Sequence, residues 1–312
     1  MMQDIALLKN VPTGVKDLFF ALGIIYILYK VISLLHRAID PFFHFEKNMA
    51  KRYGKGSWTV VTGGSDGIGK EYCYQLAKRD FNIVIIARNE EKTKAVAEDV
   101  MKKYPNIKAR VVVADFANSA KEGFFENIYE QLKSLDISMI VVNAALPVLG
   151  ALHTMPYNVA RDMIIVNCMP QVMLARYFIP QMLKRKEKSA FISISSFAAS
   201  FVRPYEGLYS ATKVFMDFFS RAIAEEYPQL DILCVKPGLV STRLLNWAKP
   251  DLRTCTTADF VNTSLRYLGR KTHTHGHWKH RLTAWTFEIM PEWLRMNRLI
   301  ARSKNLKEIG EK

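Results

Sequence analysis

Short apolar runs rich in β-branched residues alternate with longer segments of helical period between residues 57 and 240, and this alternation limits the possible folds more than any other feature. The runs are almost continuously apolar, as expected of parallel strands covered by helices on both faces, because neither side of such a strand meets water. The pattern predicts an α/β fold, a single doubly wound parallel sheet of the Rossmann type, with its ligand at the carboxyl ends of the strands. The predicted strands are 58–62, 82–87, 109–114, 137–142, 190–195 and 231–236.

Composition and charge exclude several other classes of protein. The 312 residues are 49% hydrophobic and 23% charged, which excludes a disordered chain. Four cysteines without a C-x-x-C pair exclude a disulfide scaffold and a zinc ribbon, and they fit a cytosol-facing domain. Of the net charge of +15, residues 1–56 and 270–312 carry +10. The remaining +5 is too little for a basic binding stripe, so no nucleic-acid partner is expected.

An apolar stretch from Leu18 to Leu35 is interrupted only by Lys30. Its length of about 18 residues is at the short end for a membrane span, and a Lys near one end of a span can reach the headgroups. Several Lys and Arg residues follow between Arg37 and Lys55, so the positive-inside tendency predicts that the next domain faces the cytosol. The alternative is an apolar element that lies in one leaflet. Both readings predict membrane attachment.

Three segments are expected: a membrane anchor and linker over 1–50, a catalytic domain over 51–269, and a membrane-proximal or substrate-side extension over 270–312. Within the extension, residues 282–300 resemble an interfacial amphipathic helix broken at Pro291, although the same pattern could pack on its own domain. No metal site is predicted, because one histidine cluster has no supporting Cys or carboxylate. Its members are His273, His275, His277 and His280.

A glycine-rich turn, TGGSDGIG, joins the first predicted strand to a helix. Glycines at such a turn let a pyrophosphate approach backbone N–H groups at the helix N-terminus. The alternative is a plain strand-to-helix turn. The predicted cofactor contacts here are Thr62, Gly63, Ser65, Asp66, Gly67, Ile68 and Gly69.

The second predicted strand ends in Ala87-Arg88-Asn89, with no acidic residue before Glu90. A cation at this point pairs with a 2′-phosphate, whereas an acid would bind a free 2′-hydroxyl. Arg88 therefore favours NADP(H) over NAD(H) as cofactor. Asp115, after the third strand, is either an adenine contact or a helix N-cap.

Tyr209 and Lys213 are four residues apart and therefore share one helix face. A nearby ammonium is expected to lower the pKa of the phenol toward the range useful for proton transfer. Ser196 lies thirteen residues before the tyrosine, where its hydroxyl could bind a substrate oxygen.

These motifs, in this order and spacing over roughly residues 50–300, resemble the short-chain dehydrogenases/reductases. Within that family, the chain is similar to the membrane-bound branch of 17β-hydroxysteroid dehydrogenases and very-long-chain 3-oxoacyl-CoA reductases. The residues that carry the resemblance are the 62–69 turn, Asn143, Asn167, Ser196, Tyr209, Lys213, Pro237, Gly238, Val240 and Thr242.

The resemblance implies roles for these residues. Tyr209 would protonate the carbonyl oxygen while Ser196 binds it, Lys213 would also bind the nicotinamide ribose, and Asn167 would hold a water that returns the proton. Asn143 and the segment after the sixth strand would contact the cofactor, through Pro237, Gly238, Val240 and Thr242. Alternative roles for Ser196, Asn167 and Tyr209 are a cap, a partner for a buried backbone group and a core residue.

One departure from the family concerns Ala145, which stands where relatives usually have glycine. The methyl group restricts φ close to the expected cofactor, which puts cofactor affinity in doubt.

The predicted function is NADPH-dependent reduction of a ketone on a hydrophobic substrate, a steroid or a fatty-acyl lipid, because the segments 197–208 and 244–257 are strongly apolar. Core packing could account for part of that apolar character. One alternative is a 3-oxoacyl-CoA reductase of fatty-acid elongation, and another is a catalytically weak, membrane-bound nucleotide-binding scaffold. A homodimer is possible. The expected location is the endoplasmic reticulum membrane with a cytosolic catalytic domain, and a mitochondrial membrane is the alternative.

Overall fold

The computed structural model describes residues 12–39 and 46–310. The chain divides into two compact units, Met1–Phe45 and Glu46–Lys312. The first contains helix α2, and the second contains the sheet and all the predicted site residues.

A seven-stranded parallel sheet forms the centre of the second unit, with strand order β3-β2-β1-β4-β5-β6-β9. The order reverses between β1 and β4, which is where ligands bind in open sheets of this kind. The strands are β1 (Trp58–Thr62), β2 (Asn82–Ala87), β3 (Ala109–Val113), β4 (Ile137–Val142), β5 (Ala190–Ile194), β6 (Asp231–Val235) and β9 (His273–Thr274).

The six predicted strands are confirmed, with β3, β5 and β6 each one residue shorter than predicted. The seventh strand, β9, was not predicted, because two residues carry no hydrophobic period. It pairs with β6 through Cys234 and Val235. The sheet therefore continues beyond residue 269, the predicted end of the catalytic domain.

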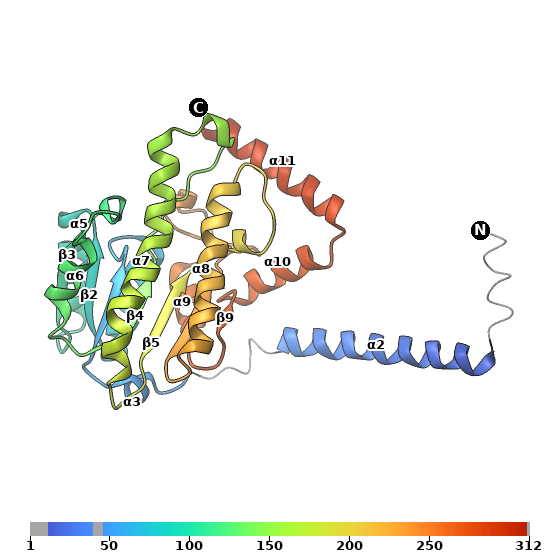
Figure 1. Cartoon of the computed structure of the whole chain (residues 1–312), viewed down its shortest axis with the longest axis horizontal. Helices are drawn as coiled ribbons and strands as arrows, with labels where there is room; N and C mark the ends of the chain where they lie inside the picture. Colours follow the sequence, from blue (N-terminus) through green and yellow to red (C-terminus); the bar gives the residue numbers. More distant parts are fainter. Residues whose placement is uncertain (1–11, 40–45, 311–312) are drawn as a thin grey trace. The chain divides into compact units, whose positions relative to one another are not determined.

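Helices cover both faces of the sheet, as the apolar strands require (Figure 1). One buried cluster joins the sheet to α4 (Gly67–Ala77), α5 (Glu90–Lys103) and α9 (Thr257–Leu265). The other joins it to α6 (Phe124–Leu132), α7 (Tyr157–Leu183) and α8 (Gly207–Glu226). The doubly wound fold class is thus confirmed.

The C-terminal helices and several short elements complete this unit. The C-terminal part has two helices separated at Pro291, as predicted. The remaining elements are α3 (Met49–Tyr53), η2 (Phe116–Asn118), η3 (Leu152–Thr154), η4 (Phe197–Ala199), β7 (Leu239–Val240), η5 (Arg243–Leu245), β8 (Thr254–Cys255), α10 (Trp278–Glu288) and α11 (Glu292–Gly310).

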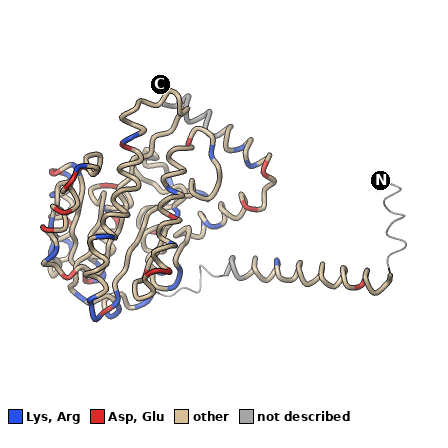
Figure 2. The backbone as a smooth tube through the Cα atoms, in the orientation of Figure 1, with Lys and Arg blue, Asp and Glu red and all other residues tan. Residues whose placement is uncertain are grey.

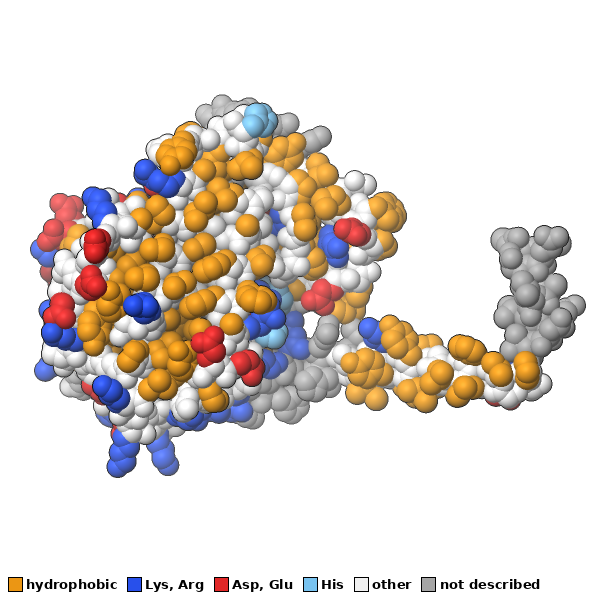
Figure 3. Space-filling view, viewed as in Figure 1, with side chains coloured by type: hydrophobic (Ala, Val, Ile, Leu, Met, Phe, Trp, Pro, Cys, Tyr) orange, Lys and Arg blue, Asp and Glu red, His pale blue; other side chains and the backbone are white. Residues whose placement is uncertain are grey.

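Helix α2 (Thr13–Ile39) contains the long apolar stretch. At 1.5 Å per residue its 27 residues extend about 40 Å. Large apolar side chains such as Phe19, Ile25 and Ile32 are exposed along it. Figure 2 shows α2 almost free of charged residues, and in Figure 3 its visible surface is mainly hydrophobic.

Among the described residues, helix α7 has the length and hydropathy of a membrane span. Of its apolar window, 44% is buried inside the unit, and residues such as Leu174 and Phe178 belong to the core below the sheet. We therefore describe α7 as a core helix.

Candidate active site

Every predicted site segment lies at the carboxyl edge of the sheet. Thr62 is the last residue of β1, Arg88 directly follows β2, and Asn143 directly follows β4. Ser196 and Pro237 each come two residues after the end of a strand, β5 and β6 respectively. The topology therefore gathers segments far apart in sequence around the point where the strand order reverses.

The glycine turn has no room for side chains at its centre. Gly63 and Gly67 have φ values of 64° and 55°, which favour glycine. A Cβ on Gly69 would lie 2.3 Å from the carbonyl oxygen of Gly63 and 2.4 Å from Nδ2 of Asn143. The turn therefore depends on glycine for its path.

Thr62 and Asn143 connect the glycine turn to the end of β4. The Thr62 hydroxyl accepts hydrogen bonds from the backbone N–H groups of Asn143, at 2.9 Å, and Ala144, at 3.0 Å. In return, Asn143 Nδ2 donates to the carbonyl oxygens of Thr62 and Gly63 at 3.2 and 3.3 Å. In this structure both side chains shape the backbone of the predicted cofactor cradle.

The helix after the turn begins with Asp66, whose carboxylate accepts a hydrogen bond from the N–H of Gly67 at 2.7 Å. The other carboxylate oxygen of Asp66 is 3.8 Å from Arg243 Nη1. A Cβ on Gly67 would come within 3.4 Å of Thr242 Cγ2, so the turn and the segment after β6 lie side by side. Ser65 is half-buried, and Ile68 packs against the core.

Arg88 is exposed after β2, and its guanidinium makes no hydrogen bond or ion pair within residues 12–39 and 46–310. It is therefore available to an anionic ligand. Asp115 caps η2, and one of its carboxylate oxygens accepts from the N–H of Ala117 at 3.0 Å. The N-cap reading of Asp115 is thus observed.

Ser196, Tyr209 and Lys213 come together between β5 and α8. Ser196 caps η4, accepting from the N–H of Ala198 at 3.1 Å, and its side chain is near enough to the Tyr209 phenol to lower the pKa of that group. Lys213 is only 2% exposed, and its Nζ lies 5.8 Å from the centre of the Tyr209 ring. The ammonium donates to the carbonyl oxygen of Ile194 at 2.9 Å.

The pKa of Tyr209 moves opposite to the sequence-based expectation. Burial raises it above its usual value, and the nearby Ser196 side chain lowers it by a smaller amount. Burial also lowers the pKa of Lys213 to about 8. The prediction that Lys213 makes the phenol more acidic is therefore wrong for the protein alone, because desolvation dominates and the ammonium donates to a backbone oxygen.

Asn167 is buried in α7 and makes three hydrogen bonds. Its Oδ1 accepts from the N–H of Leu146 at 2.7 Å, while its Nδ2 donates to the Leu146 carbonyl at 3.3 Å and to Thr212 Oγ1 at 3.0 Å. The Thr212 hydroxyl in turn donates to the backbone oxygen of Tyr209 at 2.7 Å. Asn167 therefore joins the loop after β4 to the turn of α8 that carries the tyrosine.

The segment after β6 packs against η4 and α10. The carbonyl of Pro237 accepts from the N–H of Phe197 at 2.7 Å, and the hydroxyl of Thr242 donates to the Val240 carbonyl at 3.2 Å. Val240 is buried in β7, which pairs with β8. A Cβ on Gly238 would lie 2.8 Å from the ring of His280, a contact that the sequence did not indicate.

Ala145 has a backbone conformation that its methyl group allows. It is exposed, and it is absent from the non-glycine residues of positive φ in the described chain. The departure from the family pattern therefore puts no strain on the backbone.

The C-terminal helices pack beside Ser196. The ring of Phe287, in α10, lies 5.6 Å from that of Phe197 and 5.8 Å from that of Phe201. The guanidinium of Arg295, in α11, lies 4.9 Å from the centre of the Phe201 ring. Part of the segment 270–312 thus packs on its own unit. Leu282 and several other large apolar side chains of this segment are exposed. The others are Trp278, Ile289 and Trp293.

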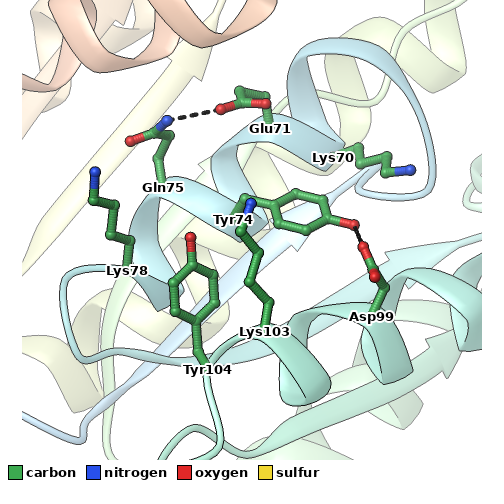
Figure 4. Close-up of a pocket in the computed structure, with 8 residues that line it drawn as sticks. All are labelled: Lys70, Glu71, Tyr74, Gln75, Lys78, Asp99, Lys103 and Tyr104. Carbon is green, nitrogen blue, oxygen red and sulfur yellow. Dashed lines mark hydrogen bonds between the residues drawn. The ribbon is translucent and has the colours of Figure 1, made fainter.

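A separate groove of about 560 Å³ lies between α4 and α5 (Figure 4). In it the phenol of Tyr74 donates to Asp99, and the ammonium groups of Lys70 and Lys103 lie over the Tyr74 ring. None of the predicted site residues lines this groove. The candidate site is therefore defined by the converging strand ends.

A family model described as short chain dehydrogenase matches residues 57–252, which include the glycine turn, Ser196, Tyr209 and Lys213. The chain belongs to the short-chain dehydrogenase family. The predicted resemblance and the nicotinamide-dependent oxidoreductase class are confirmed.

Curated relatives and solved structures agree with this assignment. A very-long-chain 3-oxoacyl-CoA reductase of Macaca fascicularis is 33% identical over 251 residues, 77% of this chain and 78% of the relative. A putative steroid dehydrogenase 3 of Caenorhabditis elegans is 28% identical over 290 residues, 88% of this chain and 90% of the relative. A 7β-hydroxysteroid dehydrogenase structure matches with a TM-score of 0.72 and 22% identity, covering 81% of this chain and 99% of that one. A Sphingobium yanoikuyae short-chain dehydrogenase in complex with NADPH gives a TM-score of 0.61 and 20% identity, with coverages of 68% and 84%.

Proposed function

We propose that the protein reduces a ketone on a hydrophobic lipid substrate with NADPH. The observation that carries this proposal is the group of three side chains at the carboxyl edge of the sheet. Ser196 is near enough to the Tyr209 phenol to lower its pKa, and the ammonium of the buried Lys213 lies 5.8 Å from the centre of the Tyr209 ring. The triad supplies a proton donor, a second hydroxyl for the same substrate oxygen and a cation in one place.

The ketone carbon accepts a hydride, its oxygen accepts the proton of Tyr209, and an alcohol and NADP⁺ result. The phenol holds its proton at neutral pH, as donation requires, although burial raises its pKa and makes it a weaker acid. Ser196 binds the same oxygen as negative charge develops on it. The hydrogen bonds of Asn167 and Thr212 hold the backbone of Tyr209 in place, and Asn167 would also hold the water that returns its proton.

Residues of this chain fit an NADPH molecule, which when bound supplies the hydride. The glycine turn would hold the pyrophosphate near the start of α4, and the exposed Arg88 would pair with the 2′-phosphate. Asp115 would contact the adenine through the carboxylate oxygen that does not cap η2. Asn143 would contact the ribose side of the cofactor. The segment 237–242, with Lys213, would hold the nicotinamide half.

The substrate class is supported by the apolar side chains beside Ser196. Phe197, Phe201 and Phe287 form a cluster there, and Val202 and Trp247 on neighbouring loops are exposed. Such a surface favours a steroid or a fatty-acyl chain over a small polar ketone. The names of the relatives support either class, and a 3-oxoacyl-CoA is the alternative to a steroid.

Membrane attachment is part of the proposal. Helix α2 is long enough to cross a hydrocarbon core about 30 Å thick, and its large apolar side chains are exposed. The amine of Lys30 lies 5.2 Å from the ring centre of Tyr26, one turn away, and such a pairing suits the interface. We assign the anchor to the endoplasmic reticulum, with the catalytic unit in the cytosol.

A homodimer through the outer face of α7 and α8 is also proposed. Large apolar side chains are exposed there, including Tyr157, Val214, Phe215 and Phe218, the last at 67%. Figure 3 shows hydrophobic side chains gathered across this face of the unit. Patches of this kind mark association surfaces.

Following NADPH oxidation with a very-long-chain 3-oxoacyl-CoA and with a 17-ketosteroid tests the function. We expect turnover of at least one of them, a preference for NADPH over NADH, and a loss of about 10²-fold or more in kcat for Tyr209→Phe. NADPH binding should persist in that variant. Equal rates for the native protein and Tyr209→Phe would leave only the nucleotide-binding scaffold.

A further inference from the structure

His280, in α10, lies outside residues 57–252, the segment that defines the family, and yet it contacts the predicted nicotinamide segment directly. It is 1% exposed. The C-terminal part of the chain therefore reaches into the carboxyl edge of the sheet.

Two contacts fix the backbone that follows Pro237. The His280 ring fills the space beside Gly238, where a Cβ would lie 2.8 Å from Cδ2 and 3.1 Å from Cγ of the imidazole. His280 Nε2 is 2.9 Å from the carbonyl oxygen of Leu239. Because a carbonyl can only accept, Nε2 carries the proton and donates it.

Neighbouring side chains hold the ring in this orientation. The Cys255 sulfur, on β8, is 3.5 Å from the same nitrogen, and the ring of Phe260 lies 5.6 Å away, centre to centre. The His277 ring is 5.7 Å away. A histidine packed on several sides cannot turn away from Leu239 without disturbing these contacts.

We propose that His280 is a positioning residue that holds the Gly238–Leu239 backbone in the conformation that receives the nicotinamide half of NADPH. This inference rests on the proposed function. It assigns to the histidine cluster a role other than metal binding. The adenine half of the cofactor would meet Arg88 and the glycine turn, and the contacts of His280 are with other residues.

The test compares two ligands by titration of full-length protein in detergent. NADPH carries both halves, whereas adenosine 2′,5′-bisphosphate lacks the nicotinamide. His280→Phe keeps a ring beside Gly238 and removes the donor to Leu239. We expect the Kd for NADPH to rise about tenfold, the effect of losing one hydrogen bond, while the Kd for the bisphosphate changes less than about twofold.

The matched control is His273→Phe, because His273 is exposed on β9 and its Nδ1 lies 3.4 Å from the hydroxyl of the neighbouring Thr272. It should leave both affinities unchanged. Equal weakening of both ligands by His280→Phe, or weakening of neither, would overturn the inference. If that variant melts below the assay temperature, His280→Gln replaces it and is judged by the same comparison. A native protein that binds neither ligand would instead refute the proposed function.

Discussion

Lys213 is a buried cation at the centre of the candidate site, and its environment sets its charge. Its ammonium donates to the Ile194 carbonyl and to the Met216 sulfur. Within the described residues, none of its hydrogen-bond partners is a carboxylate. Burial therefore lowers its pKa to about 8, so the group is charged at neutral pH and loses its charge just above.

This predicts the alkaline limb of the pH profile. The ratio kcat/KM for NADPH reports ionisations of the free enzyme, and it should fall about tenfold per pH unit above about pH 8, as Lys213 deprotonates. Tyr209 cannot cause this limb, because burial raises its pKa. Steady-state rates from pH 6 to 10 measure it, and a flat profile would contradict the role of the charged lysine.

At the scale of the elements, the sequence predicted the strands and helices that carry a regular hydrophobic pattern, and it did not predict the two-residue strand β9. Long apolar strands and the helix break at Pro291 were visible in the chain, and so were motifs contiguous in sequence, such as the turn ending in Gly69. The strand β9 was not, since two residues form no pattern. Nor was the contact of Gly238 with His280, because it joins positions far apart and only the folded chain brings them together.

Two glycines at the starts of helices should respond oppositely to alanine. Gly69→Ala forces a Cβ to within 2.3 Å of a backbone oxygen, so we expect a loss of about 2–3 kcal/mol of unfolding free energy and a loss of NADPH binding. Gly207→Ala, in α8, meets no atom within 4 Å and should stabilise by about 0.5–1 kcal/mol through the unfolded state. Urea denaturation compares them, and equal effects would show that crowding at Gly69 is relieved by movement of the turn.

At the scale of the whole molecule, the apolar helix and the catalytic unit are separate compact bodies. All the residues assigned to cofactor and catalysis belong to the second. The sheet, its two helical layers and the C-terminal helices are also within it. Membrane attachment and chemistry are therefore separable in principle.

Deleting residues 1–45 should release the protein from membranes without loss of NADPH binding. We expect the shortened protein to remain in the supernatant after ultracentrifugation. Light scattering should give twice the chain mass if the face of α7 and α8 forms the dimer. Continued sedimentation with membranes would instead assign the attachment to the exposed Leu282, Ile289 and Trp293.

The order of the strands also bears on how the protein is made. The first strand synthesised, β1, lies inside the sheet, whereas β9, near the end of the chain, forms one edge beside β6. That edge can therefore close only after all the other strands of the sheet have been synthesised. Before β9 is synthesised, β6 has β5 as its neighbour and lacks β9. Helix α10, which carries His280, is synthesised after β9. The backbone at Gly238 therefore gains its contact with His280 only after the whole sheet has been synthesised.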